Sequence, residues 1–231
     1  MRCKSIIIAP ALLVLFVPAV VSAQTPAHLW SQSFTGGGLQ MASSVAVRNT
    51  RLWVAGGFSE IDLGGAAYTS PKDDYIAMFD TDGNYQWSHA FGDAGESNTT
   101  AIGVDGSDNV YITGQFDGTV NFGGTNLVSA GGYDVFLAKF NSSGVHQWSK
   151  KFGDASLNDT GLALAVDASN NVIIGGRFSG STDFGGGVLT TAGGTDAFVA
   201  KFNSAGTHQW SKKFGDASDQ EVANLATTPA N

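Results

Sequence analysis

The residues best able to hold a metal or move a proton are the four histidines, and their spacing indicates a repeated structure. His28, His146 and His208 each lie two residues before a tryptophan, and His89 lies two residues after one. Alternate residues of a β-strand face the same side of a sheet, so we expect each histidine to share a face with its tryptophan. No His-x-x-x-His or Cys-x-x-Cys accompanies them, so the sequence does not predict a zinc site.

Aspartates recur in two sets. The set that follows a Phe-Gly pair comprises Asp93, Asp154 and Asp216. The set that precedes a predicted strand comprises Asp73, Asp134 and Asp196. Carboxylates are the ligands that Ca²⁺ prefers, which makes the first set candidate calcium ligands. We favour a structural role, because Asp at a strand end commonly accepts hydrogen bonds from backbone N–H groups. The sequence therefore predicts neither a metal nor a cofactor.

The sequence carries no enzyme motif. It has no Gly-x-Ser-x-Gly, no cysteine besides Cys3 and no glycine-rich loop leading into a helix, which are signatures of hydrolases, thiol enzymes and nucleotide-binding proteins. A general acid and base need carboxyl groups in different environments, whereas near-identical repeats supply similar ones. We therefore predict a non-catalytic protein. The formal net charge of −8 also argues against a nucleic-acid partner, which selects for clustered Lys and Arg.

Tryptophan, phenylalanine and glycine recur at fixed offsets. Residues 138–156 and 200–218 differ at only two positions, which indicates duplication. The repeated positions are Trp30, Trp87, Trp148 and Trp210; Phe91, Phe152 and Phe214; and Gly83, Gly144 and Gly206. The Gly-x-x-x-Trp pairs look like those of quinoprotein propellers, and this resemblance implies that each indole docks one repeat on the next. A large ring suits that position, since it buries a wide apolar area and its N–H needs one acceptor. The alternative is a stacking platform for a quinone or a sugar.

Each repeat is predicted to form four antiparallel strands. In the third repeat, apolar runs at 162–166 and 172–178 flank an Asp/Asn/Ser turn, and runs at 196–202 and 208–214 flank Asn203-Ser204-Ala205-Gly206. Such turns favour hairpins, because these residues bond local backbone or tolerate left-handed conformations. A glycine-rich link at 184–194 joins the two hairpins. Tandem four-stranded units with one tryptophan each are typical of β-propeller blades.

The predicted fold is therefore all-β, an incomplete or open array of propeller blades. It comprises about three four-stranded antiparallel units, at residues 42–92, 100–153 and 161–215. Partial flanking strands are expected at 30–34 and in a partial fourth unit at 221–231. Propellers close with roughly four to eight blades, so we expect either a truncated array or protomers that assemble. An unpaired strand near the C-terminus would be an open edge, which favours self-association.

Two segments of the third repeat carry a resemblance to a known family. These are AVDASNNVIIGG (165–176) and GGTDAFVAKFNSAGTHQWSKKFG (193–215). They resemble the bacterial SBBP-type β-propeller repeat, and the match covers nearly all of 42–218. The first copy departs from the pattern, with Met78 at the position of Lys139 and Lys201. The resemblance implies a propeller fold and an exported or cell-surface protein, and it implies no activity.

Residues 1–23 are predicted to be a signal peptide. A short basic start precedes an apolar run at 6–21, and Val21-Ser22-Ala23 places small residues before a cleavage site after Ala23. The run is shorter than the roughly 20 residues that span a bilayer. Residues 24–231 then form the repeat array, and they contain no segment apolar enough to span a membrane. We expect a secreted or cell-surface protein.

The predicted function is that of an exported, non-catalytic β-propeller repeat protein. It would act as a binding or structural module whose partner is an extracellular protein or a glycan. One alternative is a lectin-like propeller that binds one sugar per blade. The other is a fragment of a larger propeller enzyme, whose asymmetric, acid-lined pocket would lie on further blades.

Overall fold

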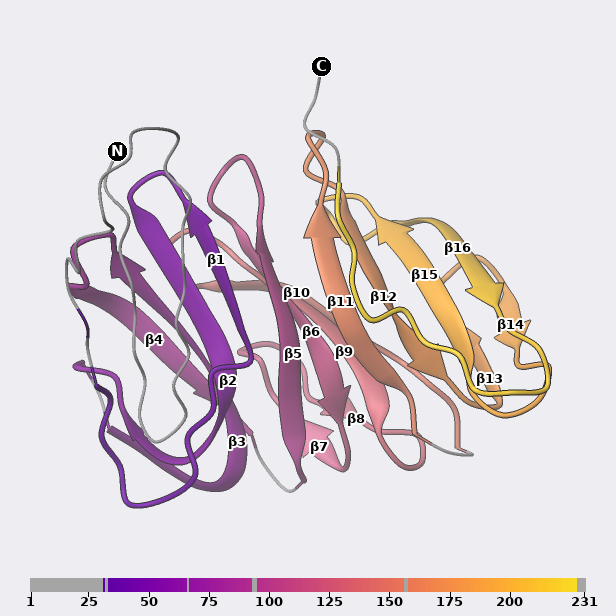
Figure 1. Cartoon of the computed structure of the whole chain (residues 1–231), viewed down its shortest axis with the longest axis horizontal. Helices are drawn as coiled ribbons and strands as arrows, with labels where there is room; N and C mark the ends of the chain where they lie inside the picture. Colours follow the sequence, from indigo (N-terminus) through magenta and orange to yellow (C-terminus); the bar gives the residue numbers. More distant parts are fainter. Residues whose placement is uncertain (1–30, 32, 66, 93–94, 156–157, 228–231) are drawn as a thin grey trace, which may run out of the picture.

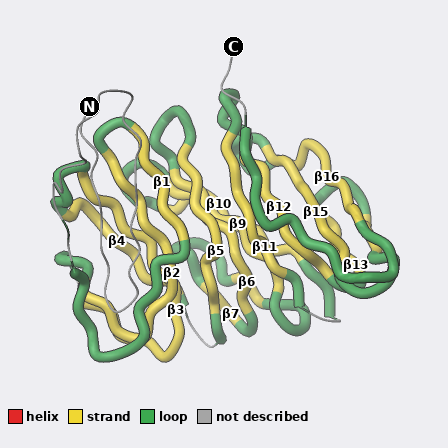
Figure 2. The backbone as a smooth tube through the Cα atoms, in the orientation of Figure 1, coloured by secondary structure: helices red, strands yellow, loops and turns green. Residues whose placement is uncertain are grey.

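The computed structural model describes residues 31, 33–65, 67–92, 95–155 and 158–227, and these residues form sixteen strands and no helix (Figure 2). The predicted signal peptide, Trp30 and Asp93 lie outside the described residues. No segment of the described part forms a helix that would cross a lipid bilayer. The all-β prediction is therefore confirmed for the part of the chain that the structure describes.

Twelve of the strands form three four-stranded antiparallel sheets, each in the order in which its strands follow along the chain. Blade one comprises β1 (Ser44–Arg48), β2 (Arg51–Asp62), β3 (Ala67–Asp80) and β4 (Tyr85–Phe91). Blade two comprises β5 (Ser97–Val104), β6 (Val110–Phe116), β9 (Asp134–Phe140) and β10 (His146–Phe152). Blade three comprises β11 (Thr160–Val166), β12 (Val172–Phe178), β15 (Asp196–Phe202) and β16 (His208–Phe214). No sheet closes on itself, which confirms the predicted open propeller blades.

The blades lie side by side in sequence order, and β5 lies between β1 and β11 (Figure 1). Each blade faces the next along the chain. We call the side of a blade that faces the following blade its trailing face, and the opposite side its leading face. The hydrophobic core lies between blades, since one cluster joins Trp53 and Ile76 of blade one to Ile112 and Phe136 of blade two. Burial of apolar area between sheets is thus what holds neighbouring blades together.

The first hairpin of every blade turns through a left-handed residue. Asn49, Asp108 and Asn170 have φ of 53°, 62° and 61°. Asn and Asp adopt this conformation more readily than other L-residues, which explains their recurrence. In blade three, the Asp167 carboxylate also accepts hydrogen bonds from the backbone N–H groups of Ser169 and Asn171. These side chains therefore fix the hairpin turns.

The glycine-rich links form two further hairpins, which the sequence did not predict. β7 (Thr119–Val120) pairs with β8 (Leu127–Val128), and β13 (Ser181–Asp183) pairs with β14 (Val188–Thr190). Each hairpin inserts one phenylalanine into the core, Phe122 or Phe184. In blade one, the long strands β2 and β3 extend to form the equivalent hairpin.

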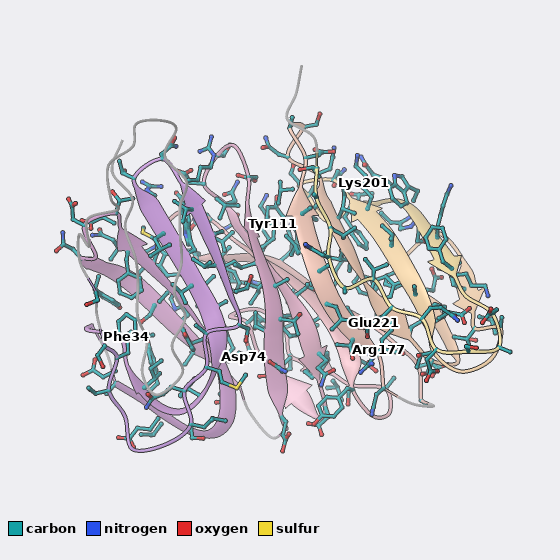
Figure 3. The ribbon with its side chains drawn as sticks, viewed as in Figure 1. Phe34, Asp74, Tyr111, Arg177, Lys201 and Glu221 are labelled. Carbon is teal, nitrogen blue, oxygen red and sulfur yellow. The ribbon has the colours of Figure 1, made fainter. Side chains whose placement is uncertain are left out.

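The C-terminal tail, residues 215–227, returns along β12 and β11 (Figure 1). The backbone N–H of Val222 donates to the Gly176 carbonyl at 3.2 Å, and the Thr227 hydroxyl donates to the Val166 carbonyl at 2.9 Å. Arg177 and Glu221 lie beside each other (Figure 3), with Nη1 3.3 Å from Oε2. The described part of the predicted fourth unit, 221–227, forms no strand but lies against the inner strands of blade three.

Candidate functional site

The repeated tryptophans join each blade to the second hairpin turn of the next. Trp87 on β4 donates from Nε1 to the Ser142 carbonyl at 3.3 Å. Trp148 on β10 donates to the Ser204 carbonyl at 3.2 Å. Both indoles are half-buried, and each acceptor lies in the turn between the third and fourth strands of the following blade. This arrangement matches the docking role that the sequence predicted for these residues.

The repeated glycines let those turns rest on the indoles. Gly144 has φ of +80°, and a Cβ built on it would lie 2.9 Å from the Trp87 ring. Gly206 has φ of +78°, and a Cβ there would lie 3.0 Å from both the Trp148 ring and Cε of Lys150. Gly83 occupies the same turn of blade one, with φ of +86°. Glycine is thus required twice, for the left-handed backbone and for the close approach.

The repeated phenylalanines form ring contacts across the same joints. Phe91 contacts Phe140 with ring centroids 5.1 Å apart, and Phe152 contacts Phe202 at 5.3 Å. Phe34, in the segment before β1 (Figure 3), contacts the equivalent Phe79 with ring centroids 5.3 Å apart and ring planes tilted by 36°. Phe34 thus occupies the place that a preceding blade would fill. The sequence reading missed the acceptor phenylalanines, although their recurrence at the end of each third strand was a visible signal: Phe79, Phe140 and Phe202.

The predicted shared face of histidine and tryptophan is wrong for His146 and His208. On β10, His146 pairs with Phe140 and Trp148 pairs with Lys139. Gln147 is thus an extra residue of β10 with no partner on β9, which is a β-bulge. The bulge turns the side chains of His146 and Trp148 to opposite faces of the sheet. The same shift occurs on β16. His146 instead contacts the Phe140 ring at 6.0 Å, and burial lowers the pKa of its imidazole.

His89 lies beyond the equivalent bulge of β4, and it does share a face with its tryptophan. Its ring lies 5.6 Å from Trp87 and 6.2 Å from Phe91. Burial lowers the pKa of His89 as well. The lowered pKa favours the neutral form of His89 and His146. His208 contacts the Phe202 ring at a centroid distance of 5.8 Å, so all three described histidines pack against aromatic rings.

The described candidate calcium ligands accept hydrogen bonds from groups of the protein itself. Asp154 accepts from the Ser181 backbone N–H at 2.7 Å. Asp216 accepts from the Ser218 N–H at 2.9 Å and from the Gln220 side chain at 2.8 Å, and these bonds lower the pKa of its carboxyl. Within the described ranges, no three His, Cys, Asp or Glu side chains form a group that could hold a metal ion. Asp216 therefore fixes its own turn, whereas Asp154 joins the segment after β10 to the start of β13.

Buried carboxylates lie at the opposite ends of the third strands. Asp134 and Asp196 are fully buried, and they accept hydrogen bonds from Lys151 at 3.1 Å and Lys213 at 2.9 Å. Asp159 lies close to Asp134, and burial raises its pKa to about 7. Asp134 and Asp196 recur in the sequence, but their lysine partners could not be predicted, because they depend on the register of β10 and β16 against the third strands.

Blade one has a further buried carboxyl, at a position where the other two blades have apolar residues. Asp74 is fully buried (Figure 3), and one of its oxygens accepts the Thr99 backbone N–H at 2.8 Å. Burial raises the pKa of Asp74 to about 7. Its positions in the other blades hold Val135 and Ala197, so the repeat pattern gave no sign of it. This contact joins β3 to β5 and is part of the joint between blades one and two.

A lysine strengthens the second joint. Lys139 donates to the Ser204 carbonyl at 2.8 Å, the same oxygen that Trp148 contacts, and its Nζ lies 5.1 Å from the Tyr111 ring centroid. The equivalent Lys201 of blade three pairs with Asp167 of its own blade at 2.7 Å. Lys139 therefore bonds across the joint to the next blade. Lys201 lies on the trailing face of the third blade and bonds within its own blade.

The trailing face of blade three carries the same aromatic residues as the two joints, but no further blade packs against them in the described structure. Trp210 is 40% exposed and Phe214 is 53% exposed, whereas Phe91 and Phe152 are 5% and 7% exposed. Lys212, between Trp210 and Phe214 on the same face, is exposed too. The tail covers the inner part of this face, over β11 and β12, and leaves the outer part on β16 uncovered. This outer part, made by Trp210, Lys212 and Phe214, is the candidate interaction site.

Comparisons with known proteins bear on the fold. No protein-family model matches the chain. The chain is similar to an uncharacterized WD repeat-containing protein of Acanthamoeba polyphaga mimivirus, with 29% identity over 147 residues, which are 56% of this chain and 10% of that protein. It is also similar to the regulatory protein FlaEY of Caulobacter vibrioides, with 27% identity over 145 residues, which are 61% of this chain and 15% of that protein.

The chain thus corresponds to a small part of either relative, 10% of one and 15% of the other. The similarity to a WD repeat-containing protein agrees with the three tandem blades. Together, the blades, their repeated joints and this similarity show that the chain has a repeat, β-propeller-like fold.

Proposed function

We propose that this chain is an exported, non-catalytic β-propeller repeat protein that binds another protein through the trailing face of its third blade. It acts as a binding or structural module outside the cytoplasm. The predicted signal peptide at residues 1–23 and the resemblance to SBBP-type repeats support export. The similar environments of equivalent residues in successive blades support a binding role over an asymmetric active site.

The exposure of Trp210 and Phe214 is the observation that carries this proposal. Large aromatic side chains gathered on one face mark interaction sites, because leaving them in water is unfavourable. The other two joints specify what such a face accepts. The partner offers a backbone carbonyl for the indole N–H and an aromatic ring for Phe214, as Ser204 and Phe202 do for blade two. These requirements are met by a protein partner.

Cysteine labelling tests the proposal in the exporting cell. Cys3 lies in the predicted signal peptide, so the processed chain has no thiol of its own. One variant, Lys212→Cys, places a thiol on the candidate site while keeping Trp210 and Phe214. The control, Val128→Cys, places one at a 57% exposed position of β8. A membrane-impermeant maleimide is applied to intact cultures and, separately, to dilute purified protein.

We expect both thiols to react in intact cultures, and Lys212→Cys to react several-fold more slowly there than in dilute purified protein. Val128→Cys should react equally in both. Labelling that requires cell lysis would overturn export. Equal rates for Lys212→Cys in the two conditions would overturn binding through this face. Labelling of the unsubstituted chain would show that Cys3 remains and would overturn removal of the signal peptide.

A further inference from the structure

We infer that the partner of this face is a second copy of the chain, which docks head to tail through the leading face of its blade one. The inference rests on the proposed function and names the partner of the same site. In the docked pair, Trp210 and Phe214 of one copy contact the turn at 80–83 and Phe79 of the other. The contact reproduces the joints that hold blades one, two and three together.

The leading face of blade one already receives a segment of the same kind. Phe34 lies on Phe79 as Phe91 lies on Phe140, at ring centroid distances of 5.3 and 5.1 Å. Residues 28–34 read HLWSQSF and β16 reads HQWSKKF, so both carry His-x-Trp-Ser-x-x-Phe. The face that accepts Phe34 of its own chain is therefore built for the sequence pattern of β16.

Charge favours β16 over the chain's own segment. In the joint between blades two and three, Cε of Lys150 lies against the Gly206 turn. The residue equivalent to Lys150 is Lys212 on β16, but it is Gln32 in the N-terminal segment. The matching turn of blade one carries Asp80 and Asp82, where the turn of blade three carries Asn203 and Ala205. Docking of β16 from another copy therefore brings a lysine to a turn that carries two carboxylates, whereas the chain's own segment has an uncharged glutamine at that position of its sequence.

The same charges disfavour the symmetric alternative. If two copies met through identical trailing faces, Lys212 of each would face Lys212 of the other, whereas Lys213 points to the leading face and pairs with Asp196. Like charges brought together at an interface cost free energy. A head-to-tail contact instead pairs lysines with aspartates. Such a contact uses two different surfaces, so repetition of it closes into a ring or extends as a filament.

Docking requires that two terminal segments move aside. β16 of one copy takes the place that Phe34 occupies in the other. β1 of the second copy takes the place of the tail of the first. In the docked pair this β1 would lie beside β11 of the first copy, just as β11 lies beside β5 within one chain. The described tail forms no sheet, and Val222 and Leu225 supply its contacts against Gly175.

Sedimentation velocity of the purified full chain at rising concentration tests the inference. We expect reversible association that weakens with added salt, because the lysine–aspartate contacts are exposed to screening. Lys212→Asp alone and Asp82→Lys alone should each weaken association by about tenfold. An equimolar mixture of the two variants should restore it. Val222→Ser with Leu225→Ser, which loosens the tail, should strengthen association.

Several outcomes would overturn the inference. A chain that stays monomeric at every concentration would do so, and the cysteine labelling above would still stand for a different protein partner. Association that survives Asp82→Lys but is lost in Phe214→Ser would indicate symmetric pairing of trailing faces. Failure of the mixed variants to associate would show that the two charged sites do not meet. Val128→Ser, an exposed substitution away from both faces, is the control for non-specific effects.

Discussion

The Phe91 ring on β4 lies against the Phe140 ring at the end of β9, with centroids 5.1 Å apart and ring planes at 29°. Phe152 and Phe202 repeat this relationship one blade further, at 5.3 Å and 28°. Around each pair, an indole bonds to a turn carbonyl and a glycine allows the turn to approach. The fold is therefore a series of similar joints between blades. Whether a joint is filled or open decides whether its aromatic residues stabilise the fold or are exposed for binding.

The first prediction compares equivalent phenylalanines in a filled and an open joint. Phe152→Ala removes a ring that is 7% exposed, and we expect it to lower the free energy of unfolding by about 3–5 kcal/mol. Phe214→Ala removes a ring that is 53% exposed and should cost less than about 1 kcal/mol. Urea denaturation of the monomer at low concentration measures both. Equal losses would show that the face on β16 is buried.

The second prediction separates the two demands on the turn glycines. Gly144→Ala imposes a left-handed alanine, at about 1–2 kcal/mol, and also places a methyl group against Trp87. Gly187→Ala imposes the same kind of strain at φ of +111°, but nothing lies within 4 Å of its Cβ. We expect thermal denaturation to show the larger loss for Gly144→Ala. Equal losses would mean that the indole contact contributes nothing.

The joints show how far the sequence could predict this structure. Trp148, Gly206 and Phe152 recur at fixed spacing, so duplication identified them as repeated positions, and a contact with the next blade was expected for the tryptophans alone. The bulge at Gln147 was not predicted, because HQWSKKF contains no glycine or proline to mark it, and simple alternation placed His146 on the wrong face. The carboxyl of Asp74 was equally invisible, since its burial depends on β5, which is distant in sequence.

The third prediction concerns pH. Burial raises the pKa of Asp159 to about 7 in the folded chain, from an ordinary value of 3.8. The folded state therefore binds more protons at this carboxyl than the unfolded state does between these values, so the contribution of Asp159 to stability is greatest below about pH 4 and falls as pH rises to about 7. Asp159→Asn removes this contribution, so stability should fall less steeply with rising pH. Some of the fall should remain, because the pKa of Asp74 is similarly raised.

Urea midpoints between pH 4 and pH 8 measure this effect. The Asn amide oxygen can still accept the Ser179 backbone N–H that Asp159 accepts at 2.7 Å. Gln220, an amide, lies at the equivalent place beside Asp196, so the fold accommodates a neutral side chain there. We expect Asp159→Asn to be more stable than the unsubstituted chain at pH 8. An unchanged slope would show that this carboxyl does not titrate between the two values.

The fourth prediction concerns the ion pairs between blades one and two. Arg48 and Arg51 of blade one contact the Asp108 carboxylate of blade two at 2.5 and 2.8 Å, and both arginines are about a third exposed. Asp108 also has a left-handed backbone, with φ of 62°, as does the equivalent Asn170. Asp108→Asn removes the charge but keeps a residue suited to that backbone. We expect it to lower the free energy of unfolding by about 0.5–1 kcal/mol.

Asp108→Ala removes the charge and also places alanine in the left-handed conformation, so it should cost about 1–2 kcal/mol more than Asp108→Asn. Urea denaturation in low and high salt separates the two contributions, because only the ionic one is screened. The difference between the unsubstituted chain and Asp108→Asn should shrink in high salt. The difference between Asp108→Asn and Asp108→Ala should not change, and a salt-dependent difference there would show that backbone strain is not its origin.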